Sequence, residues 1–275
     1  MTVSSATDAP SETDRPITID DLGERPIRLV TFDLYDTLIE LRPRRWERLQ
    51  GAMARIGIDA DAEALMWADL AGEDFFTIEN GRWPIRDRSA GEQHEFRLEH
   101  LRRWLAAADI VLEADVLERL YHVYRGEFDA HAFGSAYRPF EEVVPALVRL
   151  REAGVKRAVI SNADADVTEL CTRLAFAHEF DAIVTSALVG WEKPDPRTFH
   201  AALEHPSIGI AAEDAIHIGD QPKSDVIGAI AVGMRAALID RYHRHPAADG
   251  AVIVPTLLTL SDAVVRHNER LAAGS

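Results

Sequence analysis

Side chains able to do chemistry gather just after short apolar runs of the sequence. Three such runs, IRLVTF, RAVIS and AIHIG, are each completed or followed by carboxyl, hydroxyl or amide groups. The residues concerned are Asp33, Tyr35, Asp36, Thr37, Ser161, Asn162, Asp220 and Asp225. Lys193 adds one cation, from the tight loop GWEKPDP between the second and third groups.

This set of side chains suits chemistry on a phosphoryl group. Two or three carboxylates can hold Mg²⁺, a hard ion that prefers oxygen ligands. The ion and Lys193 can neutralise phosphoryl charge, while Ser161 and Asn162 can donate hydrogen bonds to its oxygens. A carboxylate shielded from repulsion could then attack phosphorus and form an acyl phosphate.

Such groups act together only if a scaffold brings the strand ends to one place. The runs 27–32, 157–161, 215–219 and 236–240 are short and apolar, which is typical of buried strands, and 180–186 is a weaker example. Helical patterns lie between the later runs. The alternation predicts an α/β fold with a Rossmann-like parallel sheet, whose carboxyl edge is where ligands bind.

Residues 42–136 follow a different pattern, with one helical stretch after another and no convincing strand. Trp46, Leu49 and Met53, for example, fall on one helical face. We therefore expect a helical cap at 42–136, inserted into a discontinuous core made of 27–41 and 137–275. The Ser-, Thr-, Asp- and Pro-containing start, residues 1–26, predicts a flexible tail.

Composition narrows the class of partner. The chain of 275 residues has a formal net charge of −16, which argues against binding to nucleic acid or to anionic membranes. No apolar run approaches the roughly 20 residues of a membrane span, and the first residues lack the pattern of a signal peptide. Cys171 is the only cysteine, so no intrachain disulfide can form, which is compatible with a cytoplasmic location. The oligomeric state stays open.

Four segments together resemble the motifs of the haloacid dehalogenase superfamily. DLYDTL is similar to its first motif, ISN to its second, EKPDP to its third and GDQPKSDVIGA to its fourth, in the right order and spacing. The resemblance covers about residues 27 to 240 and implies a phosphatase-like hydrolase. It also implies that the helical insert after the first motif is a cap that closes over a small phosphorylated metabolite.

The resemblance also implies a role for each matching residue. Asp33 would be the nucleophile and a metal ligand, and Lys193 would stabilise the charges of nucleophile and phosphate. Phosphoryl oxygens would be bound by Ser161, with Asn162 beside it, and Thr37 would approach them from the first motif. Mg²⁺ would be held by Asp33, Asp220 and Asp225, directly or through water.

Tyr35 departs from the phosphatase pattern of the superfamily. Phosphatases there usually have an Asp two residues after the nucleophile, which protonates the leaving oxygen and later activates water. A tyrosine has an ordinary pKa of about 10 and is a poor base at neutral pH. The backbone carbonyl of Tyr35 could still bind the metal, as it does in the family. A cap residue or Tyr35 itself would have to activate the water, and the sequence does not choose between them.

Two alternatives to a phosphatase therefore stay open. The haloacid dehalogenases of the superfamily carry Asp-x-Tyr in the first motif and need neither a general acid nor a metal, but their fourth motif lacks the paired carboxylates. Asp220 and Asp225 thus favour a Mg²⁺-dependent phosphatase. Tyr35 also fits a degenerate member that only binds a phosphorylated ligand or a partner protein.

Other charged residues near the motifs are given structural roles. We interpret Asp36 as a turn or capping residue, because Asp is common in turns. Arg42, Arg44 and Arg45 are expected to form the solvated start of a helix rather than a site for a halide and a carboxylate. The segment HEFRLEH, 94–100, is expected to be a surface helix, because its histidines are six residues apart and do not share a helical face.

Overall fold

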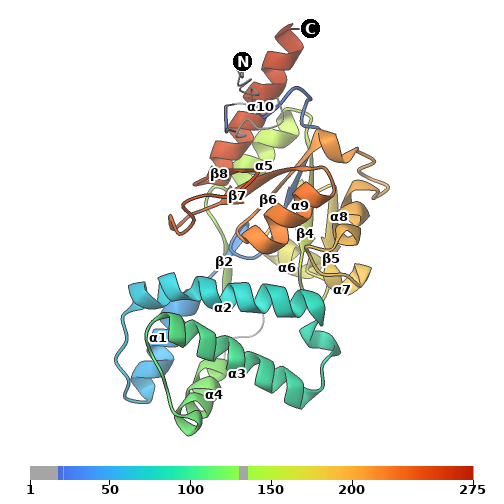
Figure 1. The fold of residues 1–275 in the computed structure, drawn as a ribbon. Helices are drawn as coiled ribbons and strands as arrows, with labels where there is room; N and C mark the ends of the chain where they lie inside the picture. The colour runs from blue at the N-terminus through green and yellow to red at the C-terminus, as the bar shows by residue number, and fades with distance from the viewer. Residues whose placement is uncertain (1–17, 21, 130–135, 275) are drawn as a thin grey trace, which may run out of the picture.

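The computed structural model describes residues 18–20, 22–129 and 136–274. Its centre is a six-stranded parallel sheet with strand order β5-β4-β1-β6-β7-β8 (Figure 1). The strands are β1 (Leu29–Phe32), β4 (Lys156–Ser161), β5 (Ala182–Thr185), β6 (Ala215–Gly219), β7 (Arg235–Ile239) and β8 (Ala251–Val254). The predicted α/β fold with a parallel sheet is confirmed, and β8 is a strand that sequence reasoning missed.

Strand β1 lies in the middle of the sheet and is buried on both faces, as its unbroken apolar run requires. Phe32 pairs with Val159 of β4 on one side and with Ile218 of β6 on the other. The chain therefore leaves β1 at Asp33 level with the ends of both neighbouring strands. This register brings the first, second and fourth motifs to one edge.

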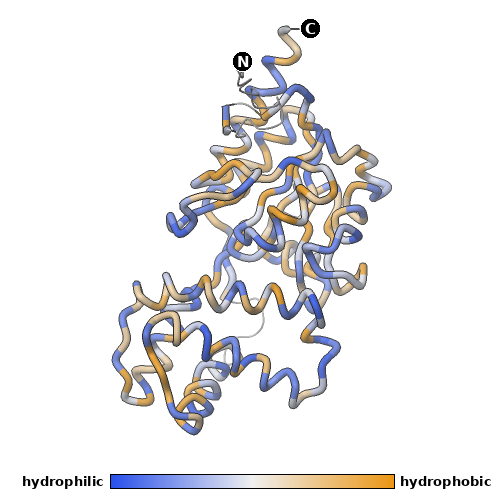
Figure 2. The backbone as a smooth tube through the Cα atoms, in the orientation of Figure 1, coloured by the Kyte–Doolittle hydropathy of each residue, from blue (hydrophilic) through white to orange (hydrophobic). Residues whose placement is uncertain are grey.

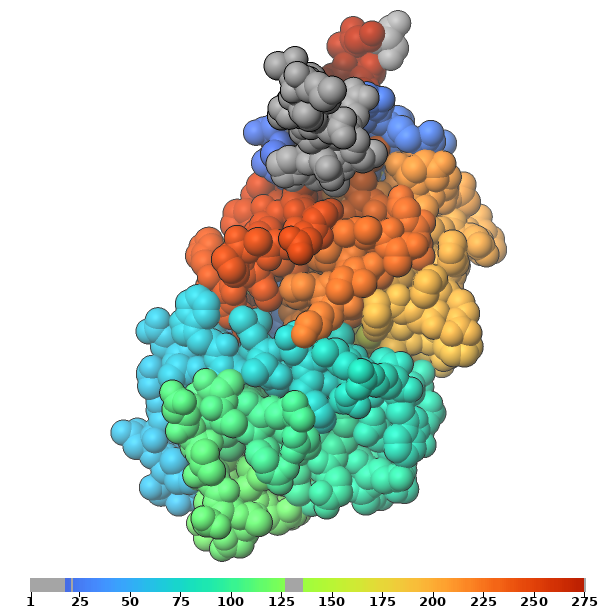
Figure 3. Space-filling view, in the orientation of Figure 1, coloured from blue at the N-terminus to red at the C-terminus, as the bar shows by residue number. Residues whose placement is uncertain are grey.

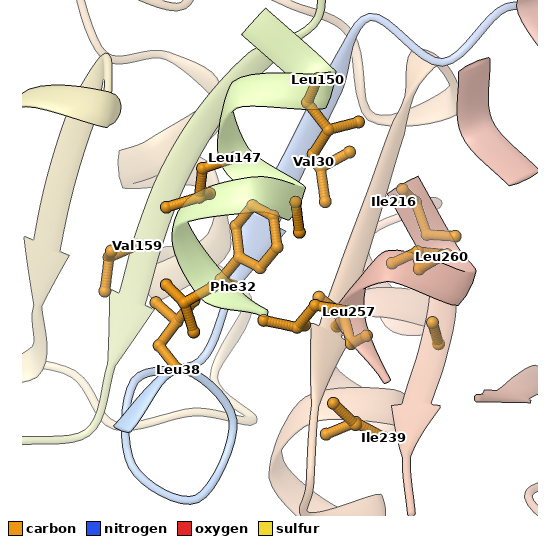
Figure 4. Close-up of a cluster of buried hydrophobic side chains, with 14 of the residues drawn as sticks. Val30, Phe32, Leu38, Leu147, Leu150, Val159, Ile216, Ile239, Leu257 and Leu260 are labelled. Atoms are coloured by element: carbon orange, nitrogen blue, oxygen red, sulfur yellow. The ribbon is translucent and has the colours of Figure 1, made fainter. Parts of the chain in front are cut away.

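Helices cover both faces of the sheet. Val30 and Phe32 point toward α5 (Val143–Glu152) and α10 (Leu257–Gly274), where Leu147 and Leu257 join the same buried cluster (Figure 4). On the opposite face, Leu29 belongs to the cluster of α8 (Pro196–Leu203) and α9 (Ile227–Ala231). The shorter elements are α6 (Thr168–Arg173), α7 (Ser186–Val189), the 3₁₀ turns η3 (Ala177–Glu179) and η4 (Ala212–Asp214), and the π-helical turn η5 (Pro222–Val226).

Four helices form the cap at the carboxyl edge of the sheet. They are α1 (Arg45–Arg55), α2 (Ala62–Arg82), α3 (Ala90–Ala107) and α4 (Ala114–Asp129), with the 3₁₀ turn η2 (Ile85–Asp87) between α2 and α3. These helices share a core of their own around Trp104, which is fully buried. Asp61 and Ser89 cap the amino ends of α2 and α3.

A two-stranded antiparallel ribbon connects the cap to the core. It pairs β2 (Ile39–Leu41) with β3 (Tyr137–Pro139), so the chain enters and leaves the cap side by side. In Figure 3 the cap, in cyan and green, lies directly against the core.

The packed core begins inside the segment that was predicted to be a flexible tail, residues 1–26. Residues 1–17 and 21 lie outside the described residues. Leu22, however, is buried in the main core cluster, so packing begins before residue 27. Hydrophobic positions alternate with hydrophilic ones along the helices (Figure 2), and no helix within the described ranges is long and apolar enough to cross a membrane.

Candidate active site

Asp33 and Lys193 form a buried ion pair at the carboxyl edge of the sheet. The backbone N–H of Asp33 donates to the carbonyl of Ile218 on β6, at 2.8 Å, which holds the residue in line with the sheet. Lys193 Nζ donates to Asp33 Oδ1 at 2.7 Å and to Asp225 Oδ1 at 2.6 Å. The structure thus joins the first, third and fourth motifs through one ammonium group.

Two carboxylates keep Lys193 charged in spite of its burial. Burial alone would lower the pKa of the lysine, but Asp225 and Asp33 outweigh it and raise that pKa above its ordinary value. The loop that carries Lys193 is fastened to Asn162. The Asn162 side chain donates to the carbonyl of Lys193 at 2.9 Å and accepts from its N–H at 2.7 Å. Asn162 therefore lies on the cavity wall, with its amide engaged by the lysine loop.

Asp225 is held by donors on both of its oxygens. Oδ1 accepts from Lys193 and, at 3.2 Å, pairs with His217 Nε2, while Oδ2 accepts from the backbone N–H of Gln221 at 3.0 Å. Lys193 and His217 lower the pKa of Asp225 below its ordinary range, against the effect of burial. A Cβ at position 219 would overlap this carboxylate, which explains why the motif has Gly219 there.

Asp33 and Asp220 differ from Asp225 in their partners: Asp33 accepts from Lys193 Nζ at 2.7 Å, and Asp220 Oδ2 accepts from the side-chain amide of Gln221 at 3.3 Å. Burial and the Asp225 charge raise the pKa of Asp33 to about 6, although Lys193 acts against them. Burial, followed by the charges of Asp36 and Asp33, raises the pKa of Asp220 well above its ordinary value. Two neighbouring buried carboxylates with excess negative charge fit a divalent cation.

The three predicted metal ligands, Asp33, Asp220 and Asp225, all line the cavity. Within the described ranges, no group of three or more His, Cys, Asp or Glu side chains is arranged to hold a metal ion. Asp225 faces Lys193 and His217 instead, as described above. A role in metal binding, direct or through water, therefore stays a prediction for Asp33, Asp220 and Asp225.

The two predicted hydroxyl ligands, Thr37 and Ser161, are fully buried. Neither hydroxyl has a hydrogen-bond partner among the described residues. Neither residue lines the cavity, whereas Asn162 does. Unpartnered buried hydroxyls are costly, and at the ends of β1 and β4 they stay candidates for phosphoryl oxygens.

A cavity of about 490 Å³ lies between this edge and the cap. Core residues on its wall include Asp33, Tyr35 and Lys193, and the cap contributes aromatic and aliphatic side chains such as Phe76 and Leu101. The ring of Tyr35 packs against Tyr137, with ring centroids 5.3 Å apart. Burial raises the pKa of Tyr35 further above its already high ordinary value. The tyrosine is therefore a hydroxyl donor on the wall rather than a base.

The interpretation of Arg45 as a solvated residue was wrong. Its guanidinium lies on the cavity wall and contacts three carboxylates: Asp69 at 2.9 Å, Glu73 at 2.8 Å and Asp36 at 3.3 Å. Asp36 does occupy a turn, with φ of 56°, but its side chain also reaches this cluster. A signal was present in the sequence, because Asp69 and Glu73 are four residues apart on one face of α2.

The interpretation of 94–100 as a surface helix was also wrong at its far end. His100 lines the cavity, and its Nε2 is buried without a hydrogen-bond partner among the described residues. That atom lies against Gly72 of α2, where a Cβ would approach it to 3.0 Å. Burial lowers the pKa of His100 to about 4, so the ring is neutral at pH 7.

Comparison with known proteins identifies the family of this chain. A family model for haloacid dehalogenase-like hydrolases matches residues 27–233. Haloacid dehalogenase-like hydrolase domain-containing protein 3 of Bos taurus is 31% identical over 222 residues, which cover 78% of this chain and 82% of that protein. Glyceraldehyde 3-phosphate phosphatase of Methanopyrus kandleri is 30% identical over 216 residues, covering 78% of this chain and 84% of that protein.

Among solved structures, a 2-haloacid dehalogenase from Pseudomonas syringae pv. Tomato superposes with a TM-score of 0.51 and 27% identity, covering 88% of this chain and 99% of the other. The fold, the motif residues at the sheet edge and the sequence relatives agree with one another. This chain therefore belongs to the haloacid dehalogenase-like hydrolase family.

Proposed function

We propose that the protein is a Mg²⁺-dependent phosphomonoesterase that hydrolyses a small phosphorylated metabolite through an aspartyl-phosphate at Asp33. The observation that carries this proposal is the ion pair of Asp33 with Lys193, at 2.7 Å, beside the uncompensated carboxylate of Asp220. Such an edge combines a nucleophile, a fixed cation and a place for a second cation.

Residues of this chain can take part in both steps of the reaction, the attack on phosphorus and the hydrolysis of the acyl phosphate. Lys193 holds Asp33 Oδ1, so the other oxygen of the carboxylate is free to attack phosphorus while the bond to the leaving oxygen breaks. The hydroxyls of Ser161 and Thr37 would donate to phosphoryl oxygens. Water then attacks the phosphorus of the acyl phosphate, which releases phosphate and restores Asp33.

The metal site would use Asp33, Asp220 and the backbone carbonyl of Tyr35. When bound, Mg²⁺ neutralises phosphoryl charge and orients the group for in-line attack. The excess of buried carboxylate at this edge supports a cation, because an anionic substrate would otherwise enter a negatively charged site.

Cavity size and relatives support a small substrate. About 490 Å³ lies within the range for metabolite pockets. The name of the Methanopyrus kandleri relative assigns to that protein a three-carbon sugar phosphate. The mixed lining, with charge on the core side and aromatic groups on the cap side, supports a substrate with one phosphate and a less polar remainder.

A second candidate function is hydrolysis of a 2-haloacid. Tyr35 in the first motif, Arg45 on the wall and the 27% identical dehalogenase structure favour it. Asp220 opposes it, because a metal-free site gains nothing from a further buried carboxylate next to its nucleophile. A member that only binds phosphorylated ligands is the third alternative, and Tyr35 is the residue that favours it.

One experiment separates the three candidates. Phosphate release is measured on a broad panel of phosphorylated metabolites, with Mg²⁺ or EDTA, for wild type and Asp33→Asn, and halide release is measured on 2-haloacids. We expect Mg²⁺-dependent phosphate release that falls about 10⁴-fold or more in the variant. The variant should stay folded, because Lys193 keeps Asp225 as its partner. Halide release insensitive to EDTA would establish the second candidate, and no release of either kind would leave a binding protein.

A further inference from the structure

The first motif lacks a side chain that can transfer a proton to the leaving group. Tyr35 holds the position of the usual acid, but its ring packs on Tyr137 and its pKa is raised by burial. A phosphomonoester of an ordinary alcohol needs that proton, because an alkoxide is a poor leaving group. Another group on the cavity wall must supply it.

The geometry points to Glu73 of α2 as this general acid and base, an inference that rests on the phosphomonoesterase function proposed above. Glu73 lines the same cavity as Asp33 and Lys193. Its Oε1 contacts Arg45 Nη1 at 2.8 Å, and its Oε2 accepts from Gln221 Nε2 at 3.3 Å. The same amide nitrogen donates to Asp220 Oδ2 at 3.3 Å. One amide therefore separates Glu73 from the carboxylate beside the nucleophile.

The charges around Glu73 favour a carboxyl that can hold a proton. In the described ion pairs, three carboxylates, Asp36, Asp69 and Glu73, share Arg45, and Arg244 adds a second cation, at 3.2 Å from Asp69. The cluster thus has one carboxylate more than its cations can pair. Burial raises the pKa of Glu73 to about 7, with Arg45 and Arg244 lowering it and Asp69 and Asp36 raising it further. Near neutral pH both forms are populated, as an acid that becomes a base requires.

Other titratable groups on the wall fit this role less well. His100 is neutral at pH 7, and its unpartnered Nε2 faces Gly72 of α2. Asp36 is held in the turn after Asp33 and pairs with Arg45. Asp164 lies exposed to solvent on the loop after β4. Glu73 is the partly buried carboxyl that α2 of the cap adds to the cavity wall.

The proposed step balances in protons and electrons. Protonated Glu73 gives its proton to the leaving oxygen as the P–O bond breaks and Asp33 forms the new bond to phosphorus. The resulting Glu73 carboxylate then accepts a proton from water as the water oxygen attacks phosphorus and releases Asp33. The products are the alcohol, inorganic phosphate and the starting enzyme.

The test compares two leaving groups in Glu73→Gln. The substrates are p-nitrophenyl phosphate, whose leaving group departs without a proton, and the alkyl phosphate that the wild type hydrolyses fastest. We expect kcat on the alkyl phosphate to fall about 10²- to 10⁴-fold. With p-nitrophenyl phosphate, a burst of about one p-nitrophenolate per site should remain and then stall, because the second step lacks its base. The burst also shows that the variant is folded.

Asp74→Asn is the matched control, one residue along α2. Asp74 pairs with Lys223 at 2.6 Å across the boundary between cap and core, and both side chains are about two-fifths exposed. This variant should keep both activities within about twofold. A first turnover that slows equally for the two leaving groups, or a loss of kcat on the alkyl phosphate smaller than about threefold, would mean that Glu73 is only a partner of Arg45. A wild type that releases no p-nitrophenolate or phosphate in an Asp33-dependent way would overturn the proposed function itself, and this role with it.

Discussion

On the core wall of the cavity, charged side chains follow strand ends, whereas on the cap wall they project from helices. Lys193 lies between Asp33 and Asp225, so one cation pairs with two carboxylates of the core. Across the cavity, Arg45 forms ion pairs with Asp69 and Glu73 of α2 and with Asp36 in the core. The first cluster is internal to the core, and the second spans the boundary between cap and core.

The two clusters therefore depend on different parts of the fold. Strand register fixes the core cluster, because Asp33 leaves β1 beside the end of β6 in any state where the sheet is intact. The cap cluster forms only when the helices dock, since Asp69 also contacts Arg244 in the loop after β7. Changes on the core wall should abolish the chemistry, while changes on the cap wall should make it selective by substrate or by pH.

Lys193→Met tests this comparison with the largest expected effect. The substitution leaves Asp33 and Asp225 buried without their shared cation, which typically costs about 3–5 kcal/mol of stability. Turnover on the best substrate should fall about 10³-fold or more, because the nucleophile and the phosphoryl group lose their fixed positive charge. Thermal unfolding and steady-state kinetics measure the two effects separately.

Lys223→Met provides the matched control for that substitution. Its ion pair with Asp74 is short, at 2.6 Å, but lies in solvent, so the loss should be below about 1 kcal/mol. Similar losses of stability and turnover in Lys193→Met and Lys223→Met would contradict the distinction between the buried Lys193 cluster and the exposed ion pair of Lys223 with Asp74.

The carboxylates of the core wall were predictable from the sequence because each of them follows an apolar run. Asp33, Asp220 and Lys193 lie at one edge of the sheet. They do so because alternating strands and helices form a parallel sheet, whose strands all end at that edge. The contacts of Asn162 were not predictable, since they depend on how closely the loop at Lys193 approaches the end of β4. Strand β8 was missed because AVIV is a short run close to the end of the chain.

The cap wall was much less predictable for a physical reason. Arg42, Arg44 and Arg45 stand close together around the start of α1, and both Arg44 and Arg45 are largely covered, by Glu40 and by Asp69 of α2 respectively. Which arginine meets which carboxylate depends on how α1 packs against α2 and the ribbon. His100 is likewise buried by the approach of α2 at Gly72 rather than by its own helix. Such contacts between helices have no signature in local periodicity.

Tyr35→Asp in the Glu73→Gln background sharpens the comparison further. It moves a carboxyl from the cap wall to the core wall, at the position that phosphatases of the family use. We expect alkyl phosphate turnover to recover about 10- to 100-fold relative to Glu73→Gln alone, although the loss of packing on Tyr137 limits the gain. Single-turnover measurements show whether both steps recover. No recovery would mean that a carboxyl at position 35 cannot take over the role proposed for Glu73.

The smallest expected effect concerns the pH dependence of stability at His100. Its pKa is about 4 in the folded protein and near its ordinary 6.5 in the unfolded chain. As pH falls below 6.5, the unfolded state takes up a proton that the folded state refuses, so the protein loses stability until about pH 4. Each pH unit in this window is worth about 1.4 kcal/mol, which gives about 2 kcal/mol between pH 7 and pH 5. Glu73 titrates in the same window and affects stability with the opposite sign, because its raised pKa makes the folded state bind the extra proton.

Comparing wild type with His100→Gln isolates the contribution of the histidine. Between pH 7 and pH 5 the variant should lose about 2 kcal/mol less stability than wild type, measured by urea unfolding at each pH. Parallel pH curves for the two proteins would place the His100 ring in contact with water and would remove it from the buried part of the cap wall.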